Sequence, residues 1–183
     1  PFFTSWQLRG KYPDIFNDEI VGEESKKLFE DAQQMLDQII QEKWVTANAV
    51  IGYYKTSSND KDDTTIFDDD GQVICTLNHL RQQRQKAPGQ ANYSLADFIA
   101  PEHTDLTDYI GAFAVTTGGN IESKVKAFED AHDDYSAIML KALADRLAEA
   151  FAEYLHFKVR TEYWGYASNE ALDNEALIKE KYV

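Results

Sequence analysis

Apolar residues recur every three or four positions along two long stretches, the spacing of a helix with one buried face. The first stretch is 23–44, and its periodic apolar residues are Leu28, Ala32, Met35 or Leu36, Ile39 and Ile40. The second is 121–164, where we expect a break near 132–135, because more than 40 unbroken helical residues are unusual in a small domain. The tail is predicted to hold a short helix after an N-cap at Ser168 or Asn169.

Strand-like segments separate the two helical stretches. Residues 47–55 are rich in β-branched and aromatic side chains, and 64–77 resembles a hairpin with a two-residue turn at Asp70-Gly71. Residues 108–119 predict a buried strand that runs into a Gly-Gly turn. Strands and helices mix without a steady βαβ alternation, which favours an α+β fold with an antiparallel sheet.

Composition narrows the class of protein. A chain of 183 residues with 43% hydrophobic content can bury one globular core. The net charge of −14 argues against a nucleic-acid backbone as partner, since that requires concentrated Lys and Arg. The chain shows no apolar run near 20 residues and no signal-peptide pattern. A single cysteine, Cys75, indicates a reducing cytosol, and its place in a predicted strand favours a buried structural thiol.

Three acids stand in one row of the second helical stretch. Asp145, Glu149 and Glu153 are four residues apart, and like charges at that spacing destabilise a helix by roughly 0.2–0.5 kcal/mol per pair. They lie off the apolar stripe, which comprises Leu140, Leu143, Leu147, Phe151, Leu155 and Val159. The row is either a solvated face offset by Lys141 and Arg146, or a face that receives a cationic ligand or a partner's imidazole or lysine.

Familiar catalytic and metal motifs are missing from the sequence. The acids of 68–71 are adjacent rather than alternating, so they do not match a calcium loop. The histidines have no zinc-site spacing, and 116–120 lacks the glycine spacing of a phosphate loop. We therefore predict no metal site and no catalytic residue from the residues alone.

Several stretches together resemble one known family. They are 2–15, 18–37, 94–101, 108–116 and above all 131–167, which contains AHDDYSAIMLKALADRLAEAFAEYLH and RTEYWGYA. The chain resembles the C-terminal activation domain of cobalamin-dependent methionine synthase over nearly its whole length. The resemblance implies a single domain over 1–183, with a C-shaped or helmet-like α+β fold, a twisted antiparallel sheet and long flanking helices.

The resemblance also implies a function. The full enzyme is a cytoplasmic methyltransferase that moves a methyl group from methyltetrahydrofolate to homocysteine through cobalamin, which another domain holds. The activation domain supports reductive remethylation of inactive cob(II)alamin, with S-adenosylmethionine as methyl donor and flavodoxin as electron donor.

Four acids match positions to which the family gives a role. Glu149 matches an acid near the S-adenosylmethionine site, and a carboxylate complements the ligand's sulfonium and ammonium charges. Asp145 matches an acid that receives a histidine displaced from the cobalamin domain, and Glu122 falls close to a second such acid. Glu180 precedes the family's main ligand motif and is expected to help shape it, whereas Glu153 inherits no role.

The sequence departs from the family pattern at its two ends. The family's Arg-Pro-x-x-Gly-Tyr motif would begin after Val183, and an Asp that contacts the substrate amine would precede Pro1. A later Tyr-Gly pair is also absent. We therefore expect both edges of the binding cleft to be missing, so that this chain alone has no complete active site. The alternative is a non-catalytic docking module that kept the fold and lost the ligand site.

The charge distribution predicts where a reductase could dock. A chain at −14 repels an acidic flavodoxin over most of its surface, so docking requires a local basic patch. The candidate patches are Arg81, Arg84 and Lys86, or Lys158 and Arg160.

Overall fold

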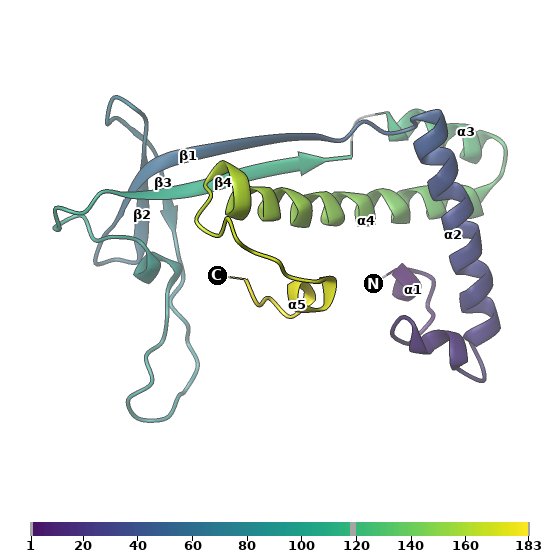
Figure 1. Ribbon diagram of the computed structural model, residues 1–183, viewed down its shortest axis with the longest axis horizontal. Coiled ribbons are helices and arrows are strands. Elements are labelled where there is room, and N and C mark those ends of the chain that lie inside the picture. The colour runs from purple at the N-terminus through teal and green to yellow at the C-terminus, as the bar shows by residue number, and fades with distance from the viewer. Residues whose placement is uncertain (1, 118–119, 183) are drawn as a thin grey trace. The chain divides into compact units, whose positions relative to one another are not determined.

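The computed structural model describes residues 2–117 and 120–182, and Figure 1 shows its helices and strands. The helices are α1 (Phe2–Ser5), α2 (Gly22–Glu42), α3 (Ile121–Asp130), α4 (Asp134–Lys158) and α5 (Asn174–Ile178), with short helical turns η1 (Asp14–Asn17), η2 (Leu95–Phe98) and η3 (Val159–Tyr163). The strands are β1 (Asn48–Ser58), β2 (Asp63–Phe67), β3 (Val73–Asn78) and β4 (Asp108–Thr116). The chain divides into two compact units: a helical unit of residues 1–49 and 115–183, and a sheet unit of residues 50–114.

The core of the helical unit lies where the predicted apolar faces meet. The predicted helix 23–44 is α2, and its buried face presents Leu28, Ala32, Met35 and Ile39, whereas Ile40 is exposed. On α4, Met139 and Leu140 are fully buried in the same core. Tyr135 at the start of α4 donates a hydrogen bond to Asp31 of α2, 2.7 Å away. Burial and that hydrogen bond raise the pKa of Tyr135 to about 12.

The predicted break in the second helical stretch is confirmed. α3 ends at Asp130, and His132 adopts a left-handed φ of 59°. The Asp133 carboxylate then accepts the backbone N–H of Ser136 at 3.0 Å, which caps α4 and lowers the pKa of Asp133. The two helices therefore form separately, each with its own start.

The sheet unit is built on a four-stranded sheet in the order β3-β2-β1-β4. β1 pairs antiparallel with β2, and β2 pairs antiparallel with β3. Thr56, Ser58, Thr64 and Ile66 face the same buried side, as the register pairs Thr56 with Ile66 and Ser58 with Thr64. The hydroxyls donate to backbone carbonyls, Thr56 to Thr65 at 2.9 Å and Ser58 to Ile99 at 2.8 Å. The predicted α+β class is confirmed.

Two predictions about the hairpin are wrong in detail. The β2–β3 connection covers residues 68–72 rather than a two-residue turn at Asp70-Gly71. The Asp68 carboxylate accepts the backbone N–H of Asp70 at 3.0 Å and of Gln72 at 2.7 Å, while Gly71 takes a φ of 78°. These bonds stabilise a wider turn. Cys75 on β3 is exposed rather than buried, because the β3 side chains remain open to solvent.

Two further predictions differ from the structure for local reasons. The predicted strand 108–119 forms as β4, but most of its side chains are exposed, so it is not a buried strand. Gly118 and Gly119, where the strand was expected to turn, lie outside the described residues. The short helix of the tail begins four or five residues later than expected. Asp173, not Ser168 or Asn169, is its N-cap and accepts the N–H of Ala176 at 2.8 Å.

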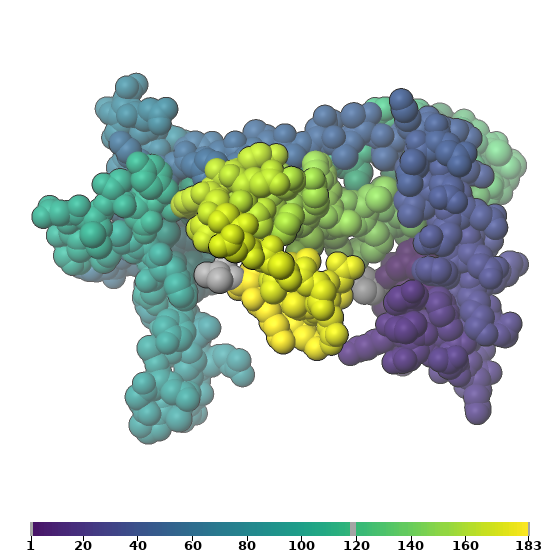
Figure 2. All heavy atoms as spheres, viewed as in Figure 1, coloured from purple at the N-terminus to yellow at the C-terminus, as the bar shows by residue number. Residues whose placement is uncertain are grey.

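The C-terminal segment, yellow in Figure 2, lies against the light green part of the chain. An ion pair joins Arg160 of η3, directly after α4, to Glu170. Arg160 of η3 is fully buried and donates two hydrogen bonds to Glu170, Nε to Oε2 at 2.8 Å and Nη2 to Oε1 at 2.7 Å. The Tyr182 ring lies 4.3 Å from the guanidinium carbon and 5.1 Å from the His156 ring. This cluster positions residues 166–182 of the helical unit.

Candidate functional site

The predicted acid row lies on the exposed side of α4. Asp145, Glu149 and Glu153 are all exposed. The opposite stripe is buried or half-buried along its whole length, from Leu140 to Val159. Packing therefore fixes the rotation of α4 and leaves the three carboxylates exposed to solvent.

The two predicted counter-cations behave differently. Arg146 donates from Nη1 to Oε2 of Glu149 at 2.7 Å, as its three-residue spacing suggested. Lys141 instead reaches Glu129 of α3 at 2.9 Å. Within 2–117 and 120–182, Asp145 forms no ion pair, so the row is only partly neutralised.

An apolar cavity of about 650 Å³ lies in the helical unit, and α4 contributes Leu143 and Arg146 to its walls. Its walls come from α1 and the loop after it, α2, α4 and α5: Phe2, Phe3, Gly10, Lys11, Tyr12, Phe29, Ala32, Gln33, Leu143, Arg146 and Ile178. Arg146 is both a wall residue of the cavity and the partner of Glu149, whereas the three acids of the row are not wall residues. Phe2 and Ile178, from segments far apart in the sequence, line this same cavity.

The other two predicted acids are exposed and lie on separate segments. Glu122 is in the first turn of α3, where a negative charge is favourable at the helix N-terminus. Nearby Lys124 lies 3.9 Å from the Trp44 ring and 3.9 Å from Glu42. Glu180 follows α5 with a left-handed φ of 52°, two residues beyond the cavity residue Ile178.

The Arg160–Glu170 pair is a structural feature that sequence reasoning missed. Glu170 holds the pKa of Arg160 above its ordinary value through their hydrogen bonds, and the guanidinium lowers the pKa of the Glu170 carboxyl in return. Burial, with a smaller contribution from Arg160, lowers the pKa of His156. No short motif identifies such a pair, since an arginine and an acid ten residues apart are ordinary in a charged chain.

The two predicted basic patches are largely engaged within the chain. Arg160 is fully buried, so its proposed role in docking is wrong: the ion pair with Glu170 holds the guanidinium inside. Lys158 pairs with Glu162, one turn further along. Lys86 donates from Nζ to the Ala91 carbonyl at 2.6 Å, a hydrogen bond within the loop that contains both residues.

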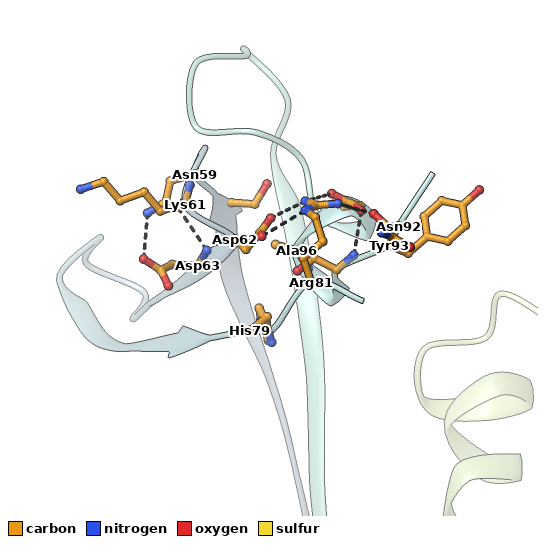
Figure 3. Close-up of polar contacts among 12 residues, drawn as sticks. Asn59, Lys61, Asp62, Asp63, His79, Arg81, Asn92, Tyr93 and Ala96 are labelled. Carbon is orange, nitrogen blue, oxygen red and sulfur yellow. Dashed lines mark hydrogen bonds and ion pairs between the residues drawn. The ribbon is translucent and has the colours of Figure 1, made fainter. Parts of the chain in front are cut away.

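Arg81 is a structural clamp in the sheet unit (Figure 3). It pairs with Asp62 and, through two bonds of 2.8 Å, with Asp97, and it donates to the Asn92 carbonyl at 2.7 Å. Arg81 and the Ser94 backbone lower the pKa of Asp97 to about 2. Of the predicted patches, Arg84 is left as an exposed cation with no ion pair in the described part of the chain.

Metal and membrane chemistry find no support in the described residues. Within 2–117 and 120–182, no three His, Cys, Asp or Glu side chains gather as a metal site would require. The helices of the same residues are too short or too polar to cross a bilayer.

The acid row and the apolar cavity offer two different kinds of surface in the helical unit. Exposed carboxylates offer hydrogen-bond acceptors and negative charge, while aromatic and aliphatic walls offer stacking surface. The cavity volume of about 650 Å³ falls in the range of small-molecule sites, about 300–1,000 Å³. The cavity can therefore take a small organic molecule with an apolar part, and its charged wall residues are Lys11 and Arg146.

Two comparisons with known proteins agree. The family described as "Vitamin B12 dependent methionine synthase, activation domain" matches residues 1–183. A solved structure, "Crystal Structure of the MetH Reactivation Domain bound to AdoHcy", is similar at 54% identity with a TM-score of 0.90. The match covers 100% of this chain and 56% of that chain, so this chain spans little more than half its length. The chain belongs to the activation-domain family of the vitamin B12-dependent methionine synthases.

Proposed function

We propose that this chain forms the body of a reactivation domain that supports reductive remethylation of cob(II)alamin in a methionine synthase. One observation carries the proposal: the whole chain matches, at 54% identity, a reactivation domain whose structure contains AdoHcy. AdoHcy is S-adenosylmethionine without its transferred methyl group, so a site that holds one has the shape to hold the other. S-adenosylmethionine would supply the methyl group, and cobalamin would be held by another domain of the same enzyme.

Glu149 and Asp145 are assigned separate roles on the exposed side of α4. Glu149 would face the charged end of S-adenosylmethionine, since its carboxylate is exposed and lies near the apolar cavity through Arg146. Asp145 would receive an imidazole from the cobalamin domain. Its exposure and lack of an ion pair among the described residues leave its charge available for such a partner.

Glu122 and Glu180 take supporting roles in the proposal. Glu122 is exposed at the start of α3 and would offer a second acid to the cobalamin domain. Glu180, close to the cavity residue Ile178, would shape the ligand site together with the segments of the longer family members.

The electron donor would be flavodoxin or a similar reductase in the cytoplasm. Of the predicted basic residues, Arg84 is the exposed cation free of an ion pair in the described residues, so it is the first position to test. The docking-module alternative is not favoured, because the similar structure contains a bound nucleoside.

Calorimetric titration of S-adenosylmethionine and S-adenosylhomocysteine tests the proposal. The ligands are titrated into this chain and into the full-length protein. The Glu149→Gln variant of the full-length protein tests the role of Glu149, and its Glu153→Gln variant is the matched control. We expect binding by the full-length protein, a weaker affinity in Glu149→Gln and no change in Glu153→Gln. Absence of binding by the full-length protein would refute the ligand assignment and move the docking-module alternative ahead.

A further inference from the structure

Arg146 lies between the acid row and the apolar cavity. Its side chain is 34% exposed and lines the cavity, and its guanidinium bonds Glu149 at 2.7 Å. The other cation within one turn of the row, Lys141, is engaged with Glu129 on α3. Arg146 is therefore the side chain that neutralises Glu149 in the protein without ligand.

We propose that Arg146 determines how strongly the site prefers a positively charged ligand, because it competes with the ligand's cation for the Glu149 carboxylate. The inference rests on the function proposed above. S-adenosylmethionine and S-adenosylhomocysteine share their adenosyl and amino-acid groups, and they differ by a methyl group and the positive charge of the sulfonium. A guanidinium on Glu149 weakens the attraction for the sulfonium more than the attraction for the neutral thioether.

This competition narrows the difference in affinity between the methyl donor and the demethylated product. The shared ammonium group contributes equally to both ligands, so its effect cancels in the ratio of dissociation constants. The ratio therefore isolates the charge on sulfur. Because both partners of the pair are partly exposed, with Glu149 at 66%, solvent screens the effect. We expect a change of up to about fivefold, the range that exposed ion pairs support.

The Arg146→Met variant of the full-length protein tests the inference. Methionine keeps the apolar stem that lines the cavity and removes only the charge. Calorimetry with both ligands should show S-adenosylmethionine gaining up to about fivefold in affinity relative to S-adenosylhomocysteine. Arg146→Lys should keep the wild-type ratio. Lys126→Met, which breaks an exposed pair with Asp130 on α3, is the matched control and should also leave the ratio unchanged.

A second background separates the mechanism from a general change of charge. In the Glu149→Gln variant, Arg146 has no Glu149 carboxylate to pair with. Adding Arg146→Met to this variant should therefore change the ratio of dissociation constants by less than half as much as Arg146→Met changes it in the wild-type protein. Arg146→Gln, a neutral polar variant, repeats the test should the methionine variant fold poorly.

Three outcomes would overturn the inference. An unchanged ratio in both neutral variants, with both ligands still bound, refutes the role of Arg146 alone and leaves the proposed function standing. An equal effect with and without Glu149 refutes the competition. Absence of binding of either ligand by the wild-type full-length protein refutes the proposed function and the inference together.

Discussion

Replacing Arg160 by leucine should destabilise the protein more than any exposed charge change. The side chains of Arg160 and Glu170 are 0% and 5% exposed, and two hydrogen bonds of 2.8 and 2.7 Å join them. Arg160→Leu leaves the Glu170 carboxylate buried without its cation. Breaking a buried pair in this way costs about 3–5 kcal/mol.

The expected change is large against the total stability of a domain, about 5–15 kcal/mol. With an m-value of about 2 kcal/mol per molar urea, the unfolding midpoint should fall by about 2 M. Urea unfolding followed by circular dichroism measures this shift. Because burial without a cation raises the pKa of a carboxyl, Glu170 should take up a proton more readily in the variant, so the deficit should shrink as the pH is lowered.

Two controls separate the buried pair from charge in general. Lys179→Met breaks a pair whose side chains are 55% and 75% exposed, and it should leave the midpoint within about 0.3 M of wild type. The double variant Arg160→Leu with Glu170→Leu should recover much of the loss, since apolar groups often replace a buried ion pair at little cost. A shift below about 0.5 M for Arg160→Leu, or no recovery in the double variant, would refute the reasoning.

Three further outcomes follow from other parts of the structure. Leu140→Ala, at a fully buried position, should lower the free energy of unfolding by about 2–5 kcal/mol. Ile138→Ala, at 48% exposure, should lower it by less than about half of that. Equal losses in urea unfolding would contradict the assignment of Leu140 to the core. Burial lowers the pKa of His156, so the contribution of this residue to stability is present above the ordinary value of 6.5 and is lost as the pH falls through the lowered pKa. The urea midpoint of His156→Asn should therefore fall less on acidification than that of the wild type. An identical pH profile would refute burial of His156 as the source of this pH dependence. Asp97 has a pKa of about 2 against an ordinary 3.8, so it should stabilise the Arg81 clamp above pH 3.8 and lose this effect as the pH falls toward 2. Asp97→Asn should speed the hydrogen exchange of residues 80–93 at neutral pH. Unchanged exchange would show that the clamp does not hold this loop.

Local patterns predicted the regular elements well. The spacing of Leu28, Ala32, Met35 and Ile39 predicted α2, and the length argument predicted the break that Asp133 caps before α4. These signals are reliable because helix periodicity and capping act over a few residues, and the sequence contains those residues directly. The acid row and its Arg146–Glu149 pair could be read in the same way.

Local reasoning failed where solvent exposure depends on distant segments. Cys75 and β4 were expected to be buried because their residues favour strands, yet strand propensity does not say whether anything covers a strand. Arg160 was a docking candidate because it forms a local basic patch with Lys158, but it is buried against Glu170, ten residues away.

The sequence by itself determined the helices, the strand order along the chain, the exposed acids and, through long matching stretches, the family. The tertiary structure decided which cation neutralises which acid, and it placed Phe2, Arg146 and Ile178 around one cavity. The physical reason is range: helix period and caps are set between near neighbours, whereas burial, ion pairing and cavity walls depend on residues that only the folded chain brings together.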